Sequence, residues 1–116
     1  MKIVLGDENL HINLNTLEKM GAAKGSIAVS YSDLVSAFIE KPHSPKGMKL
    51  VGTNLPGMIE LGTYVSKTGK EFWYTRKGNN DFLIIVLKSG FYSRLIIETE
   101  DSAGLAQKIT ERIERI

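Results

Sequence analysis

Apolar and polar residues alternate clearly near the start of the chain. Leu10, Ile12 and Leu14 fall on one side of an extended segment and polar residues fall on the other, which is the period of a half-buried strand. The short apolar segment Lys2–Leu5 comes before it, across the polar residues Gly6-Asp7-Glu8. The two segments are therefore predicted to pair as a hairpin.

The last third of the chain has the most definite pattern. Residues 82–87 are apolar at every position and are followed by a Lys88-Ser89-Gly90 turn, a second strand over residues 91–98 and one helix. Thr99 or Asp101 is the predicted N-cap of that helix. Its apolar stripe consists of Leu105, Ile109, Ile113 and Ile116. A strand that is apolar on both faces needs cover on both sides, from a barrel interior and from the helix or a neighbouring subunit.

The middle of the chain predicts further strands separated by turns. Residues 34–40 fit a strand or a single helical turn, and their β-branched and aromatic side chains favour the strand. Residues 15–24 predict a short helical turn with Leu17 and Met20 as its apolar contacts. The other predicted strands are residues 26–30, 48–51, 58–65 and 71–76, with turns at 54–57, 66–70 and 78–80. The pattern predicts about seven strands and one long C-terminal helix.

Length and composition fit one mainly β domain over residues 1–116. The chain has no cysteine, which excludes disulfides and thiolate chemistry and fits a reducing compartment. The opening residues do not have the pattern of a signal peptide, and no apolar run approaches the roughly 18 residues of a membrane span. A cytoplasmic, soluble protein is expected.

Several segments together resemble the bacterial pleckstrin-homology-like (PH-like) domains. The resemblance rests on residues 9–17 running into Glu18-Lys19, on residues 26–33, 57–64 and 72–74, and on residues 82–98 running into 101–113. It implies a seven-stranded bent β-barrel with one end closed by the C-terminal α-helix. It also implies a non-enzymatic binding or scaffolding module, but it assigns a functional role to no individual residue of this chain.

A basic loop in mid-chain is the first candidate site. Residues 41–49 contain Pro42 and Pro45, which exclude a sheet interior, and no acidic residue. The candidate anion-binding residues are Lys41, His43, Lys46 and Lys49. The alternative interpretation is a solvated loop whose lysines serve solubility.

A second basic group flanks the aromatic segment Phe72-Trp73-Tyr74. Such a pattern can bind single-stranded nucleic acid, but alternation places Trp73 on the face opposite Phe72 and Tyr74, so core aromatics are the simpler interpretation. The flanking residues are Lys67, Lys70, Arg76 and Lys77. A net charge of only +2 also argues against a nucleic-acid partner.

The sequence shows no catalytic or metal-binding pattern. His11 and His43 are the only histidines and have no ligand spacing, so no metal and no cofactor are predicted. Ser44 is next to His43 in the sequence, but this adjacency alone does not give the geometry of a catalytic triad. The leading hypothesis is a non-enzymatic module that binds a protein or an anionic ligand, with peripheral membrane contact as one form. The alternatives are a homo-oligomer that assembles through edge strands and, third, an enzyme of unrecognised type.

Overall fold

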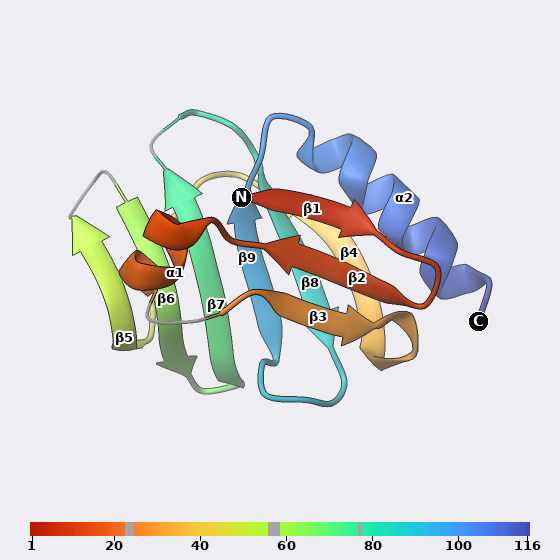
Figure 1. Cartoon of the computed structure of the whole chain (residues 1–116), viewed down its shortest axis with the longest axis horizontal. Helices are drawn as coiled ribbons and strands as arrows, with labels where there is room; N and C mark the ends of the chain where they lie inside the picture. The colour runs from red at the N-terminus through yellow and green to blue at the C-terminus, as the bar shows by residue number, and fades with distance from the viewer. Residues whose placement is uncertain (23–24, 56–58, 77) are drawn as a thin grey trace.

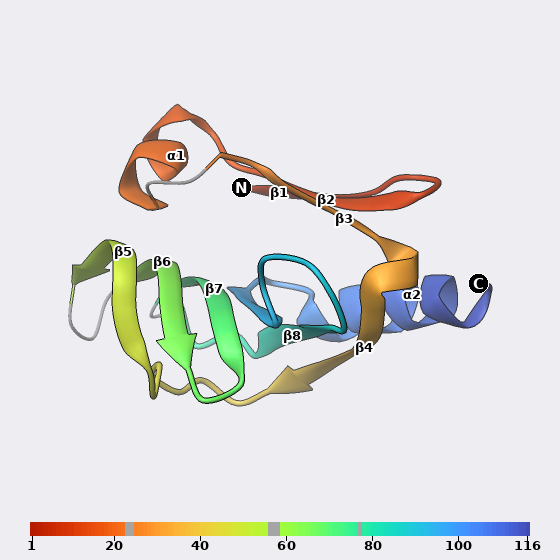
Figure 2. The ribbon, with the colours of Figure 1, turned by 90° about the horizontal axis from the view of Figure 1, so that it is seen from below.

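The computed structural model describes residues 1–22, 25–55, 59–76 and 78–116, in two stacked β layers (Figures 1 and 2). The smaller layer is a three-stranded antiparallel sheet of β1 (Lys2–Leu5), β2 (Asn9–Asn13) and β3 (Ile27–Ser30). The larger layer is a six-stranded sheet in the order β4-β8-β9-β7-β6-β5. Its strands are β4 (Leu34–Glu40), β5 (Met48–Leu55), β6 (Ile59–Ser66), β7 (Gly69–Arg76), β8 (Phe82–Leu87) and β9 (Arg94–Glu98).

Three helical segments complete the described fold. They are α1 (Thr16–Ala22), the short 3-10 helix η1 (Tyr31–Asp33) and the C-terminal helix α2 (Ser102–Glu114). No helix in the described residues is long and apolar enough to cross a membrane. We call the face of the six-stranded sheet that packs against the small sheet the inner face, and the opposite face the outer face.

The main core lies between the two sheets. Leu10 and Ile12 of β2 are fully buried and belong to the same apolar cluster as Leu83 of β8 and Ile97 of β9. The alternation at the start of the chain is thus confirmed, as is the β1–β2 hairpin. The antiparallel β8–β9 hairpin is also confirmed, although β9 begins at Arg94 and not at residue 91.

The C-terminal helix was predicted correctly in position but not in every contact. Asp101 caps it, since its carboxylate accepts the Gly104 N–H at 3.2 Å. Ala106 and Ile109 are buried in the main core, so α2 covers the inner face beside the small sheet (Figure 2). The prediction that Ile116 belongs to the apolar stripe of the helix was wrong, because Ile116 lies beyond the helix and is 71% exposed.

Helix α1 corrects another contact prediction. The helical turn is confirmed over Thr16–Ala22, but Leu17 and Met20 are 79% and 73% exposed. Glu18 and Ala22 point inward instead. In a helix of two turns the capping residues set which side faces the core.

The predicted mainly β fold with a C-terminal helix is confirmed, while its details differ. The described residues form nine strands, not about seven, and the two sheets are separate rather than closed into one barrel. Residues 34–40 are a strand, as favoured. β5 continues through Leu55, so the turn predicted to begin at residue 54 was wrong there. The rest of that turn, and Lys77, lie outside the described residues.

Candidate functional site

The connection between β4 and β5 crosses the whole outer face, because these strands are the two edges of the six-stranded sheet. We call residues 41–47 the strap; Figure 2 shows it running below the sheet. Five inter-strand spacings alone amount to about 24 Å, and the strap also crosses the twisted sheet diagonally, because the registers place Glu40 level with Asn54 and not with Met48. The eight residue steps from Glu40 to Met48 reach at most about 26–29 Å. The strap must therefore be almost fully extended, which Pro42 and Pro45 favour.

An apolar row of cross-strand partners lies beneath the strap. Trp73, Ile96 and Ile84 are no more than 2% exposed, although no sheet or helix formed by the described residues covers the outer face. From β6 to β4 the row consists of Gly62, Trp73, Ile96, Ile84 and Phe38. The prediction that Trp73 faces away from Phe72 and Tyr74 is confirmed, since those two belong to the main core. The apolar character of β8 on both faces follows from this second, smaller core.

Paired glycines leave the end of this row without side chains. Gly52 of β5 lies opposite Gly62 of β6, and both have positive φ, at 136° and 144°. A Cβ added to either would lie 2.6 Å from the partner's Cα, so no other residue fits. The backbone is therefore bare beside Trp73, the cross-strand partner of Gly62.

His43 fastens the middle of the strap to the outer face. Its ring centroid lies 5.4 Å from the Trp73 ring, edge to face, and 5.4 Å from the Phe82 ring. Its Nε2 lies 2.9 Å from Glu40 Oε1. Aromatic contacts of this kind contribute about 0.5–1.5 kcal/mol each, so the strap is held by a few modest contacts.

A cavity of about 1090 Å³ opens between the strap and the β6–β7 turn. Its apolar lining includes Trp73, Ile96, Val65 and Met48. Its ionisable lining consists of Glu40, Lys41, His43, Lys46, Lys67, Glu71 and Arg94. The cavity thus combines an apolar wall with charged groups of both signs, as ligand sites do.

Glu71 is a buried carboxylate in this lining. It is 7% exposed, its Oε1 accepts the Trp73 indole N–H at 3.1 Å, and its Oε2 lies 3.5 Å from Ser66 Oγ. Arg94 is its cross-strand partner on β9. Because buried polar atoms need hydrogen-bond partners, these two contacts hold Glu71 in place, and Glu71 in turn orients the indole.

The cations around the cavity differ in whether they have acidic partners. Lys41 Nζ lies 3.3 Å from Asp81 Oδ1, and Arg94 Nη2 lies 4.0 Å from Glu40 Oε2. Among the described residues, Lys46 and Lys67 have no carboxylate within ion-pair distance. These two lysines line the cavity from different segments, one from the strap and one from the β6–β7 turn.

The predicted anion-binding loop is therefore only partly brought together. Lys41, His43 and Lys46 line the cavity, whereas Lys49 does not, because β5 has begun there and pairs it with Tyr64. Lys67, which the sequence placed in a different group, joins the site. Glu71 and Arg94 were missed, since only the strand order places them under the strap.

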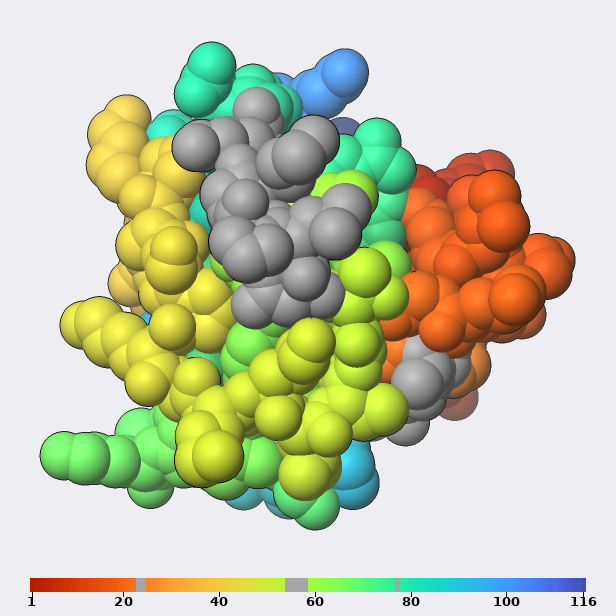
Figure 3. Space-filling model, turned by 90° about the vertical axis from the view of Figure 1, so that its left-hand side faces the viewer, coloured from red at the N-terminus to blue at the C-terminus, as the bar shows by residue number. Residues whose placement is uncertain are grey.

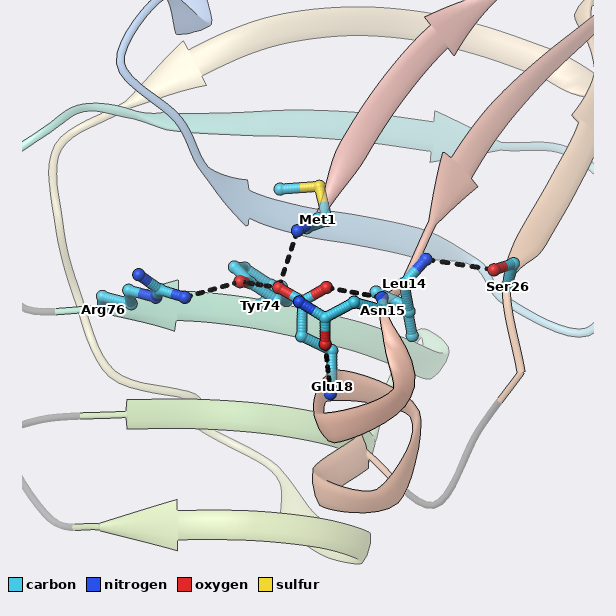
Figure 4. A network of polar contacts seen from close by, with 7 residues as sticks. All are labelled: Met1, Leu14, Asn15, Glu18, Ser26, Tyr74 and Arg76. Carbon is cyan, nitrogen blue, oxygen red and sulfur yellow. Dashed lines mark hydrogen bonds and ion pairs between the residues drawn. The ribbon is translucent and has the colours of Figure 1, made fainter.

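A separate polar network lies at the inner face (Figure 4). Glu18 Oε1 accepts the Asn15 N–H at 2.8 Å and Asn15 Oδ1 accepts the Glu18 N–H at 2.8 Å, a capping box at the start of α1. Glu18 Oε2 also accepts from the Met1 ammonium at 2.7 Å and from the Tyr74 hydroxyl. Arg76 donates to the same hydroxyl at 3.0 Å. The Asn15-x-x-Glu18 spacing was the signal that sequence reasoning missed.

The hydrogen bonds of this network shift the pKa values of Glu18 and Tyr74 in opposite directions. Burial alone would raise the pKa of Glu18, but hydrogen bonds from the Met1 ammonium, Tyr74 and Asn15 outweigh it and lower the pKa. Burial raises the pKa of Tyr74, and Glu18 raises it further. A pocket of about 140 Å³ borders the network. The polar atoms of Glu18 and Tyr74 already bind one another, so the network fastens α1 to β7.

No group of three or more His, Asp or Glu side chains in the described part of the chain could hold a metal ion. The comparisons with known proteins gave nothing similar: no family model matches the chain, and no curated protein or solved structure matches it either.

Proposed function

We propose that this chain is a non-enzymatic binding module whose ligand site is the cavity under the strap. The observation that carries the proposal is the cavity itself, about 1090 Å³ in volume and walled by Trp73 and charged side chains. The proposal keeps the binding or scaffolding role implied by the PH-like resemblance. The mainly β fold with a C-terminal helix supports that resemblance only at the level of architecture.

The hydrogen bonds around His43 favour binding over catalysis. Its Nε2 faces Glu40, and its Nδ1 lies 3.4 Å from the backbone oxygen of Ser44, not from a hydroxyl. Glu71 is held by Trp73 and Ser66. In the described lining, therefore, no hydroxyl group is positioned against His43 as a nucleophile would be.

Trp73 provides the test, because it is the only tryptophan in the chain. Ligands that enter the cavity should change its fluorescence in a saturable way. We suggest titrating anionic, cationic and neutral amphiphiles and repeating each titration with Val65→Phe, which narrows the cavity. Loss of the response in that variant supports the site. A panel that leaves Trp73 emission and the melting temperature unchanged would refute the proposal.

Self-association through β5 is the second candidate function, and one observation favours it. β5 is an edge strand, and Met48, Leu50 and Val51 are 81%, 58% and 42% exposed (Figure 3 looks onto this edge). Light scattering over a wide concentration range should then show a dimer that Leu50→Lys dissociates. The matched control is Val35→Lys on β4, the opposite edge. A monomer at every concentration excludes this function.

A further inference from the structure

We propose that the ligand of the cavity is a small anionic amphiphile, with one carboxylate or phosphate monoester group on an aliphatic or aromatic body. The charged head lies at the mouth between Lys46 and Lys67, and the body lies along Met48 and Val65, on the side of the cavity that Trp73 borders. This inference rests on the proposed binding function and adds the class of ligand.

The two free lysines define where the head binds. Lys46 comes from the strap and Lys67 from the β6–β7 turn, so they approach the cavity from two walls. The other cations of the lining, Lys41 and Arg94, already lie beside Asp81 and Glu40. Two uncompensated ammonium groups facing one space attract a single anionic group more strongly than either does alone.

Glu71 determines the orientation of the ligand. Its carboxylate lies beside the indole edge of Trp73, 7% exposed and held in place by Trp73 and Ser66. An anion next to it would be repelled, because like charges at short range in a partly desolvated site cost free energy. The ligand's charge therefore stays at the mouth, and its uncharged end points toward the floor.

Apolar surface is available for the body of the ligand. Met48 and Val65 border the cavity with 81% and 39% of their surface exposed. An apolar body that covers them gains free energy in proportion to the area removed from water. A stacked nucleic-acid base fits less well, because Trp73 is only 2% exposed and its ring already contacts the rings of His43, Tyr64 and Phe82.

The experiment compares ligands that share a ten-carbon chain and differ in the charge of the head group. Decanoate, decyl phosphate, decyltrimethylammonium and a decyl glycoside are titrated as monomers while Trp73 fluorescence is recorded, with inorganic phosphate as the head alone. We expect saturable binding of the two anions, and binding at least about tenfold weaker for the cationic and neutral compounds and for phosphate. Equal binding of the cationic or neutral compound overturns this inference but leaves the cavity as a binding site. If no compound of the panel changes Trp73 fluorescence, both this inference and the proposed function are wrong.

Variants then test the geometry. Lys67→Glu should weaken decyl phosphate binding at least about tenfold, whereas Lys108→Glu on α2, at the inner face, should leave it unchanged. Glu71→Gln should tighten it a few-fold, because a like charge is removed while the amide oxygen can still accept the Trp73 N–H. Unchanged affinity in Lys67→Glu contradicts the proposed head position.

Vesicles distinguish a free ligand from a lipid surface. Sedimentation with phosphatidylglycerol vesicles, lost in Lys67→Glu but kept in Lys108→Glu, identifies a membrane lipid as the source of the anionic head. Binding of decyl phosphate monomers without vesicle sedimentation identifies a free amphiphile. Vesicle binding that is indifferent to Lys67→Glu counts against the inference, since the charge then acts elsewhere on the surface.

Discussion

The two faces of the six-stranded sheet are closed in different ways. On the inner face, β1–β3, α1 and α2 form a folded layer over a large apolar core. On the outer face, a smaller cluster around Trp73 is covered by the seven residues of the strap. Figure 3 shows the two covers on opposite sides of the β5 edge.

The difference lies in how many contacts each cover has. The inner layer has its own hydrogen-bonded strands and a buried carboxylate, Glu18, that fastens α1. The strap is an extended chain held by the contacts of His43 and by one exposed ion pair, Lys41–Asp81. Segments with few buried contacts open at lower free-energy cost. We therefore expect the inner face to supply most of the stability, and we expect a ligand to enter at the outer face.

The largest effect is expected from neighbouring residues on β9 that point to opposite faces. Ile97 is in the main core and Ile96 in the cluster under the strap, and they are 0% and 1% exposed. Ile97→Ala should cost about 4 kcal/mol and Ile96→Ala about 2 kcal/mol, since the strap can settle into the space left behind. Urea unfolding measures both. A larger loss for Ile96→Ala would reverse the comparison.

Glu18→Gln tests the inner network. We expect a loss of about 2–3 kcal/mol at neutral pH, because a buried carboxylate that pairs with the Met1 ammonium is removed. Since the pKa of Glu18 is lowered from its ordinary 4.5, its contribution is present above that value and lost as the pH falls below it.

The difference in urea midpoint between wild type and Glu18→Gln should therefore shrink as the pH is lowered through 4.5 and further into the acidic range. Glu111→Gln, on the exposed side of α2, is the control and should show neither effect. A constant difference across this pH range would mean that the charge of Glu18 contributes nothing.

Gly47→Ala tests the point where the strap joins β5. A Cβ there would lie 2.0 Å from the backbone oxygen of Val65, so the strap or β6 must move, at a cost of about 2 kcal/mol. Trp73 emission should shift to longer wavelength as water reaches the ring. Gly25→Ala is the matched control, because nothing lies within 4 Å of its added Cβ. Equal stability of the two variants would show that the strap is not fixed there.

His43→Ala should have the smallest effect on stability, about 1 kcal/mol, because it removes two ring contacts and an exposed pair with Glu40. Quenching of Trp73 fluorescence by acrylamide should nevertheless increase. Unchanged quenching would mean that His43 does not cover the indole.

The local pattern of apolar and polar residues predicted most of the helices and strands. It failed where contacts with distant segments of the chain set the orientation of an element. Alternation placed Leu10 and Ile12 on the core face and Trp73 on the face opposite Phe72, and the cap, Asp101, was one of the two predicted candidates. The side chains of α1 were assigned to the wrong face, because its orientation depends on Glu18 reaching Tyr74, 56 residues away.

The loop of the candidate site could be predicted from the sequence, but the strand residues beneath the loop could not. Pro42, Pro45 and the lysines marked residues 41–47 as an unusual segment. Strand order was not predictable, because β4 pairs with β8 while β5 lies at the opposite edge, and those pairings join segments far apart in the sequence. Only this order stretches the strap over Trp73 and brings Lys67 and Lys46 to the same cavity.

The most direct test of the account is the NMR signal of the single indole N–H, which Trp73 donates to Glu71. On titration with decyl phosphate, this resonance and the backbone amides of the strap should shift together and saturate together. The amides of Leu10, Ile97 and other inner-face residues should move little. Shifts that are confined to the inner face or to the surroundings of Glu18, with an unmoved indole signal, would contradict the assignment of the outer face as the binding site.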